Sequence, residues 1–102
     1  MHYSRLVWSH SSPNEPIEIL SEYDEAGWEL RKVEVFQNGA TRYASTSEAV
    51  AGCQLSLIPR PPDEEVVSEP EFRLFQLTPE QFEKAWELSR RGYPAMPTGI
   101  SA

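Results

Sequence analysis

Apolar and polar residues alternate over three short stretches in the first half of the chain. Residues 2–9 (HYSRLVWS) and 17–23 (IEILSEY) have this pattern, which predicts β-strands because successive side chains of a strand point to opposite faces. The first stretch has apolar residues at both parities, which favours a central strand, covered on each side, rather than an edge strand. A third strand is predicted over residues 28–36, which are rich in β-branched and aromatic residues.

Asn38 and Gly39 predict the turn of a β-hairpin after this third strand. A type I′ turn needs positive φ at both central residues, and Asn-Gly is a favoured pair for it. Residues 41–43 then return as the partner strand. The sequence therefore predicts a hairpin centred on Asn38-Gly39.

The apolar alternation slips inside the third strand. Trp28 and Leu30 have one parity and Val33 and Val35 the other, so a regular strand would send the two pairs to opposite faces. A β-bulge near residues 31–32 would restore a single buried face. We therefore expect a bulge there and expect both pairs to support the same core.

The middle of the chain has weaker patterns. Ser45 or Ser47 is expected to cap a helical turn that Gly52 closes. Residues 54–58 (QLSLI) are a strand candidate, and a second helical turn is expected from Pro62. Residues 72–77 (FRLFQL) predict a last strand.

The clearest helix signal lies near the end of the chain. Thr78 is the expected N-cap, Pro79 takes the first helical position, and Gln81 completes a capping box. Phe82 and Trp86 lie four residues apart on one predicted helix face. The sequence predicts a helix over residues 79–91, and it predicts core positions for three tryptophans, Trp8, Trp28 and Trp86.

These elements predict an α+β fold. The expected architecture is an antiparallel sheet of four to five strands in a meander, packed by one C-terminal helix, because short connections favour neighbouring strands. A chain of 102 residues has the length of one domain. We place that domain at residues 1–92 and expect a loosely ordered tail over residues 93–102.

The chain is acidic, with a net charge of −7 from 16 acids and 9 bases. This balance argues against nucleic acids and anionic membranes as partners, because both are polyanions. One cysteine excludes an internal disulfide and is typical of a reducing compartment. Since no apolar run is long enough for a membrane span or a signal peptide, we expect a cytoplasmic protein.

Residues with catalytic or metal-binding chemistry are few and scattered. His2, His10 and Cys53 have no metal-ligand spacing, and the five glycines form no phosphate-binding loop. Ser9, His10 and Asp24 would make a triad on paper only, because the chain has no nucleophile elbow. We therefore expect no catalytic residue, no cofactor and no metal.

The acidic residues concentrate in two clusters. The first falls between Ser11 and Leu30 without an intervening base, and Glu18 and Glu22 share a strand parity beside which Glu29 is expected to align. Each cluster is either a solvated face that maintains solubility or a docking surface for a cationic protein. The candidate partner-binding residues are Glu18, Glu22, Asp24, Glu25 and Glu29 in the first cluster, and Asp63, Glu64, Glu65, Glu69 and Glu71 in the second.

A family resemblance rests on a series of segments along the chain. The chain contains MHYSR and WSH at the start, then NEPIEILSEYD, GWELRKVEVF, N-G and Y-A, and later PEF and TPEQFEKAW. These segments cover about residues 1–88 and resemble a family of small acidic bacterial proteins of unknown function. That family resembles the immunity proteins of polymorphic toxin systems, and the resemblance implies tight binding to a cognate toxin.

Two classes of function follow from the sequence. The first is a non-enzymatic protein-binding domain, namely an immunity protein that neutralises a cognate toxin, such as a basic nuclease, through an acidic surface. The second is a small ligand-binding or enzymatic domain with a pocket between sheet and helix. A regulatory interaction module with another partner is a further alternative.

Overall fold

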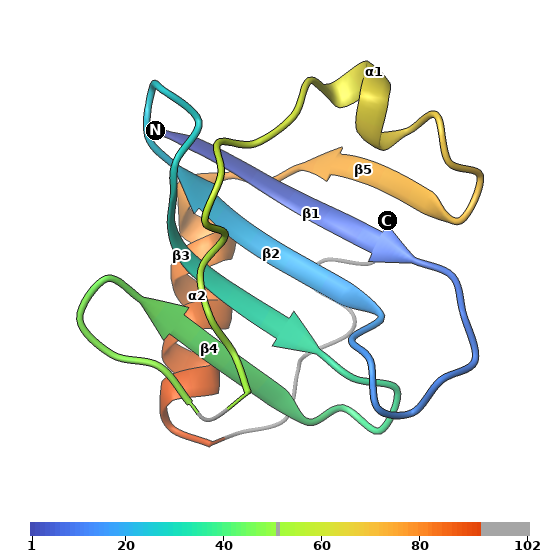
Figure 1. Ribbon diagram of the computed structural model, residues 1–102. Helices are drawn as coiled ribbons and strands as arrows, with labels where there is room; N and C mark the ends of the chain where they lie inside the picture. Colours follow the sequence, from blue (N-terminus) through green and yellow to red (C-terminus); the bar gives the residue numbers. More distant parts are fainter. Residues whose placement is uncertain (51, 93–102) are drawn as a thin grey trace.

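The computed structural model describes residues 1–50 and 52–92. It confirms the α+β class: a five-stranded antiparallel sheet carries a C-terminal helix on one face (Figure 1). The expected tail over residues 93–102 lies outside the described residues. The strands are β1 (His2–Trp8), β2 (Glu18–Tyr23), β3 (Glu29–Val35), β4 (Thr41–Ser45) and β5 (Phe72–Gln76).

The sheet has the strand order β4-β3-β2-β1-β5. The first four strands form the predicted meander, and every neighbouring pair is antiparallel. β5 enters after a long connection and pairs with β1 at the other margin of the sheet (Figure 1). The first strand therefore lies between two others, as its apolar residues at both parities predicted.

The hairpin between β3 and β4 forms at the predicted place, but the predicted turn type is wrong. Gly39 N–H donates to the Phe36 carbonyl and Phe36 N–H donates to the Ala40 carbonyl, both at 2.9 Å. Gly39 has φ of 88°, whereas Asn38 does not have positive φ. The turn is thus a three-residue loop with a glycine bulge, and Asn38 Oδ1 accepts a hydrogen bond from Ala40 N–H at 2.9 Å.

The predicted bulge is present in β3, one position before residues 31–32. Glu22 of β2 faces Arg31, whereas the next residue, Tyr23, faces Glu29. Leu30 is therefore the extra residue. The bulge changes the parity of the strand between Trp28 and Val33, as the apolar pattern required.

Helix α2 (Pro79–Arg90) starts as the sequence predicted. Thr78 Oγ1 accepts a hydrogen bond from Gln81 N–H at 3.1 Å, and Thr78 N–H donates to Gln81 Oε1 at 2.9 Å, which completes the capping box. The helix lies across β2, β3 and β4 (Figure 1), and we call the sheet face that it covers the helix face. The core between them consists of Leu20, Val33, Val35, Phe82 and Trp86.

Two tryptophans do not lie in this core. Trp28 precedes the bulge and is 44% exposed, so its predicted core position is wrong. Trp8 is half-buried at the end of β1, where its ring lies 5.8 Å from that of Phe72. Only Trp86, which is 5% exposed, has the predicted core role.

The connection over residues 46–62 crosses the sheet on the side opposite to α2 (Figure 1), and we call this side the loop face. Hydrogen bonds tie the connection to β3 and to the turn before it: Arg60 N–H donates to the Gly27 carbonyl and Ser56 N–H to Glu29 Oε1, both at 2.8 Å. It continues into the short helix α1 (Asp63–Val66), which forms where a helical turn was predicted.

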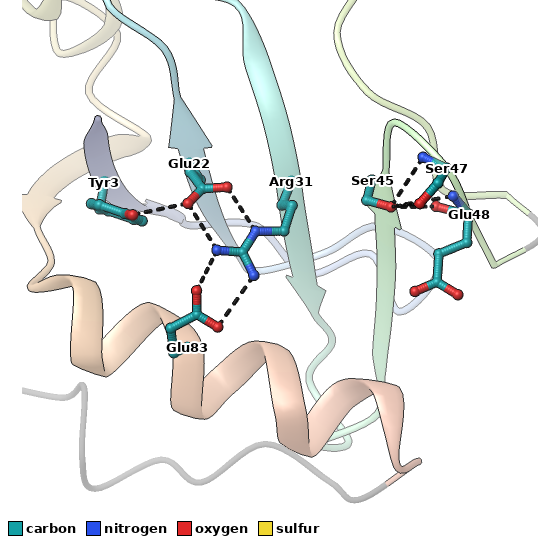
Figure 2. Close-up of polar contacts among 7 residues, drawn as sticks. All are labelled: Tyr3, Glu22, Arg31, Ser45, Ser47, Glu48 and Glu83. Atoms are coloured by element: carbon teal, nitrogen blue, oxygen red, sulfur yellow. Dashed lines mark hydrogen bonds and ion pairs between the residues drawn. The ribbon is translucent and has the colours of Figure 1, made fainter.

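Two predictions for this connection are wrong. Over residues 46–50, which the structure describes, the helical turn expected after β4 does not form. Ser45 Oγ accepts hydrogen bonds from Ser47 N–H at 3.3 Å and Glu48 N–H at 3.2 Å, as a helix cap would (Figure 2). However, Ser45 N–H donates to the Glu48 carbonyl at 2.7 Å and Ala49 pairs with Ala44, so the chain turns back along β4 instead. Residues 54–58 form no strand, because they cross a sheet face rather than pair with a sheet edge. Among residues 1–50 and 52–92, no helix is long and apolar enough to cross a membrane.

Candidate functional site

The first acidic cluster does not form the shared outward surface that the sequence predicted. Glu18 and Glu22 lie on the helix face with Leu20, whereas Glu29 lies on the loop face. Glu22 and Glu29 are each only 7% exposed. The bulge at Leu30 separates them, because it shifts the register by one residue.

Glu22 belongs to an ion-pair network that links three strands to α2 (Figure 2). It accepts hydrogen bonds from Tyr3 Oη at 2.9 Å, from Arg31 Nε at 2.7 Å and from Arg31 Nη2 at 2.8 Å. Arg31 also binds Glu83 of α2, and its Nη1 lies 3.2 Å from Glu83 Oε2. The network therefore joins β1, β2, β3 and α2 at one end of the helix face.

Arg31 also covers the aromatic core. Its guanidinium carbon lies 4.9 Å from the Phe82 ring centroid and 5.2 Å from that of Trp86, which are cation–π distances. The Arg31 hydrogen bonds hold the pKa of Glu22 below its usual range, and the bond to Glu22 raises the pKa of Tyr3. These groups satisfy one another and link the sheet to α2.

Two other acids of the first cluster also have internal partners. Glu29 accepts hydrogen bonds from Ser21 Oγ and Ser56 N–H, both at 2.8 Å, and anchors the connection to the loop face. Glu18 accepts a hydrogen bond from Arg5 Nε at 2.6 Å on the helix face. Both carboxylates therefore hold the fold together.

The turn between β2 and β3 carries the remaining members of this cluster. Asp24 Oδ1 accepts hydrogen bonds from Ala26 N–H at 2.9 Å and Trp28 N–H at 3.0 Å, so it shapes the turn. Glu25 is exposed; its Oε1 lies 2.8 Å from the Met1 amino group and its Oε2 lies 3.2 Å from His2 Nε2. Of the five candidate residues in this cluster, Glu25 is the one with an exposed side chain.

The second cluster is exposed as a whole. We call residues 63–71 the acidic segment; it comprises α1 and the turn that leads into β5. Asp63 pairs with Arg60. The other four acids have no ion-pair partner among the described residues and are exposed; they are Glu64, Glu65, Glu69 and Glu71.

Large apolar side chains are exposed near the same end of the sheet, and the sequence did not single them out. Leu57 is 81% exposed, Ile58 67% and Val67, inside the acidic segment, 48%. Trp28 lies close to the connection over residues 46–62, because its neighbour Gly27 is hydrogen-bonded to Arg60. The parity slip was the one signal in the sequence that set Trp28 apart from Val33 and Val35.

The loop face also buries the single cysteine. Cys53 is 4% exposed, and burial, followed by the negative charge of Glu34, raises the pKa of its thiol to about 12. A protonated thiol is a poor nucleophile and a poor metal ligand. Within residues 1–50 and 52–92, no three His, Cys, Asp or Glu side chains converge as metal ligands.

A groove of about 290 Å³ lies at the margin of the sheet. Residues of β5 form one side of it, and the N-terminal end of β1 and the Arg60–Asp63 ion pair form the others. The groove is therefore next to the acidic segment and away from the core.

The sheet and the capped helix form a small α+β domain. Its buried carboxylates have partners within the fold, whereas four acids of the exposed acidic segment have no ion-pair partner among the described residues. Residues 2–91 match the family described as a domain of unknown function, DUF6881, and the chain belongs to this family. No curated protein matches the chain. No solved structure matches it either.

Proposed function

We propose that this chain is a non-enzymatic protein-binding domain that docks onto a basic protein through its acidic segment. The observation that carries this proposal is the exposure of Glu64, Glu65, Glu69 and Glu71 without internal ion pairs. The acids of the first cluster, by contrast, are mostly engaged within the fold. The uncompensated negative charge thus concentrates on one segment.

The distribution of the bases supports the same conclusion. All charged residues of the chain lie within the described residues, and seven of the nine bases have an acidic partner. The two other bases are Arg73, which follows the acidic segment in β5, and Lys84 of α2. The four acids of the segment without an ion pair therefore outnumber the one such base beside them. A surface of one sign speeds the association of a partner of opposite sign and selects against others.

The exposed apolar side chains add a second element to this surface. Protein interfaces combine a few apolar or aromatic anchors with a polar rim. Val67 lies within the acidic segment, and Leu57 and Ile58 lie on the connection that leads to it. Trp28 lies on the turn whose Gly27 is hydrogen-bonded to Arg60 of that connection. We infer that these side chains provide the anchors and that the acids provide the rim.

Within this class, we propose that the chain is an immunity protein that neutralises a cognate bacterial toxin in the cytoplasm. The family resemblance supports this assignment, and a nuclease toxin would supply the basic surface, because nucleases bind a polyanion. In such a complex the acids would occupy positions that substrate phosphates otherwise take. The same surface would serve a regulatory module with a different basic partner.

A pocket between sheet and helix is less well supported. The large side chains of Leu20, Val33, Phe82 and Trp86 are buried at 5% exposure or less and pack in that space. Binding at the surface is therefore favoured over binding inside the domain.

Co-expression with a candidate toxin, the product of the gene next to the one for this chain, tests the proposal. We expect the wild-type protein to restore growth and to co-purify with the toxin. The variant E64K/E65K is expected to lose protection, whereas E15K/E87K, which changes net charge equally at distant exposed sites, retains it. If wild-type protein neither protects cells nor forms a complex, the immunity assignment is wrong; if both variants behave as wild type, the acidic segment is not the surface.

A further inference from the structure

β5 lies at one edge of the sheet (Figure 1). Part of its outward backbone has no backbone hydrogen-bond partner among the described residues. On its inner side, Leu77 N–H donates to the Tyr3 carbonyl at 3.3 Å, and Ser9 N–H donates to the Glu71 carbonyl at 2.8 Å. Because hydrogen-bonded positions alternate along an antiparallel pair, the N–H and C=O groups of Leu74 and Gln76 point away from β1. No backbone group of the described residues binds them.

The two margins of the sheet differ in this respect. Along β4, the C-terminal part of the outer edge is covered: Val50 N–H donates to the Tyr43 carbonyl at 3.0 Å, and Ser45 N–H donates to the Glu48 carbonyl at 2.7 Å. Along β5, Phe72 N–H binds the Glu69 carbonyl at 3.1 Å and the cover stops there. Within residues 1–50 and 52–92, the β4 edge is thus partly covered, whereas the β5 edge is open from Leu74 to Gln76. An open edge is a template for a further strand.

The open part of β5 borders the groove described above. Leu74, Gln76 and Leu77 line the groove from the sheet, and Arg60 and Asp63 line it from the start of α1. An added strand would direct alternate side chains toward this groove. Backbone bonds to the edge and side-chain contacts in the groove are the two elements of strand addition.

We propose that β5 accepts an extended segment of a basic protein as a sixth strand, an inference that rests on the proposed function for the charge of the partner. Glu69 and Glu71 immediately precede β5, and α1 packs beside it. The incoming strand would therefore run along the acidic segment. A second copy of this chain fits poorly, because it would bring two acidic segments and two net charges of −7 together.

Amide hydrogen exchange, followed by NMR on the full chain, tests this inference with defined peptides. The probe is a capped peptide with alternating Lys and Val, and the matched control has Glu in place of Lys. When its free concentration is ten times its dissociation constant, the Lys peptide is expected to slow exchange at the Leu74 and Gln76 amides by roughly tenfold, because only the unbound protein exchanges. The Glu peptide is expected to leave both amides unchanged.

Backbone variants separate strand addition from simple charge attraction. L74P removes an outward N–H, which an edge strand tolerates, and is expected to abolish protection at Gln76, whereas L74V retains the N–H and the protection. Q76P provides the same test at the second position, read at Leu74, if L74P does not fold.

The outcomes distinguish this inference from the proposed function. Protection at Leu74 and Gln76 by the Lys peptide, lost in L74P, supports strand addition even if no toxin complex forms. A toxin complex that leaves these two amides unprotected overturns strand addition while the proposed function stands. Binding that persists unchanged in both proline variants, or self-association through β5 in sedimentation experiments, also overturns it.

Discussion

Arg31 shows how one charged residue satisfies two requirements of this fold. It neutralises Glu22, which is 7% exposed, and its guanidinium lies over the rings of Phe82 and Trp86. A buried ion pair adds little stability over an apolar pair, but the removal of one partner leaves an uncompensated charge. Arg31 is therefore sensitive to substitution although it lies outside the apolar core.

The variant R31A is expected to lower the free energy of unfolding by about 3 kcal/mol, because Glu22 would remain buried without its base. Urea unfolding monitored by tryptophan fluorescence measures this change. R91A is the matched control, since Arg91 pairs with Glu87 in a solvent-exposed contact, and its cost is expected to be below about 0.5 kcal/mol. Equal costs for the two variants would show that the network adds no stability.

Glu22 also makes stability depend on pH. Its pKa is lower in the folded protein than in the unfolded chain, because Arg31 and Tyr3 bind the carboxylate. The carboxylate therefore contributes stability above the unfolded pKa of about 4.3, and this contribution is lost as pH falls through the lower folded pKa. E22Q is expected to flatten the acid limb of the stability profile, and an identical limb in wild type and E22Q would contradict this cause.

Cys53 gives a separate test of the loop face. Because burial keeps the thiol protonated at neutral pH, native protein is expected to react slowly with a thiol-specific reagent and unfolded protein rapidly. Spectrophotometric thiol titration with and without urea measures the ratio. Rapid modification of the native protein would show that the connection over residues 46–62 does not cover Cys53 stably.

Among the secondary-structure elements, the features that depend on a few neighbouring residues were predicted from the sequence. The capping box at Thr78, the turn at Gly39 and the parity slip in β3 were each readable from a few neighbouring residues. The type I′ turn was predicted wrongly because the choice between two turns depends on the register of both strands. The strand over residues 54–58 was also wrong, since the stretch has no partner strand and Leu57 and Ile58 lie exposed.

A pair of tryptophan variants tests the division between core and surface. W86A is expected to cost about 4 kcal/mol, because it removes a buried ring from the helix–sheet interface. W28A is expected to cost much less in unfolding free energy, because Trp28 is 44% exposed, but to weaken binding of the basic partner. Thermal or urea unfolding separates the two, and a large stability loss in W28A would contradict its surface assignment.

At the scale of the whole molecule, the sequence predicted acidic clusters but not how the fold would use them. Glu22 and Glu29 became internal partners because the strand register places Arg31 beside one and Ser21 and the connection beside the other. The acidic segment stayed exposed because α1 has no buried residue. Ten candidate residues thus separate into structural and accessible acids only after strand pairing is known.

The salt dependence of the association rate with the basic partner shows whether docking uses the acidic segment. Measured by stopped-flow fluorescence between about 0.05 and 0.5 M salt, the rate for wild type and for the control E15K/E87K is expected to fall steeply, because salt screens steering charges. The rate for E64K/E65K is expected to be lower at low salt and to change much less. A wild-type rate that does not depend on salt, or a slope that is the same in E64K/E65K, would contradict docking through the acidic segment.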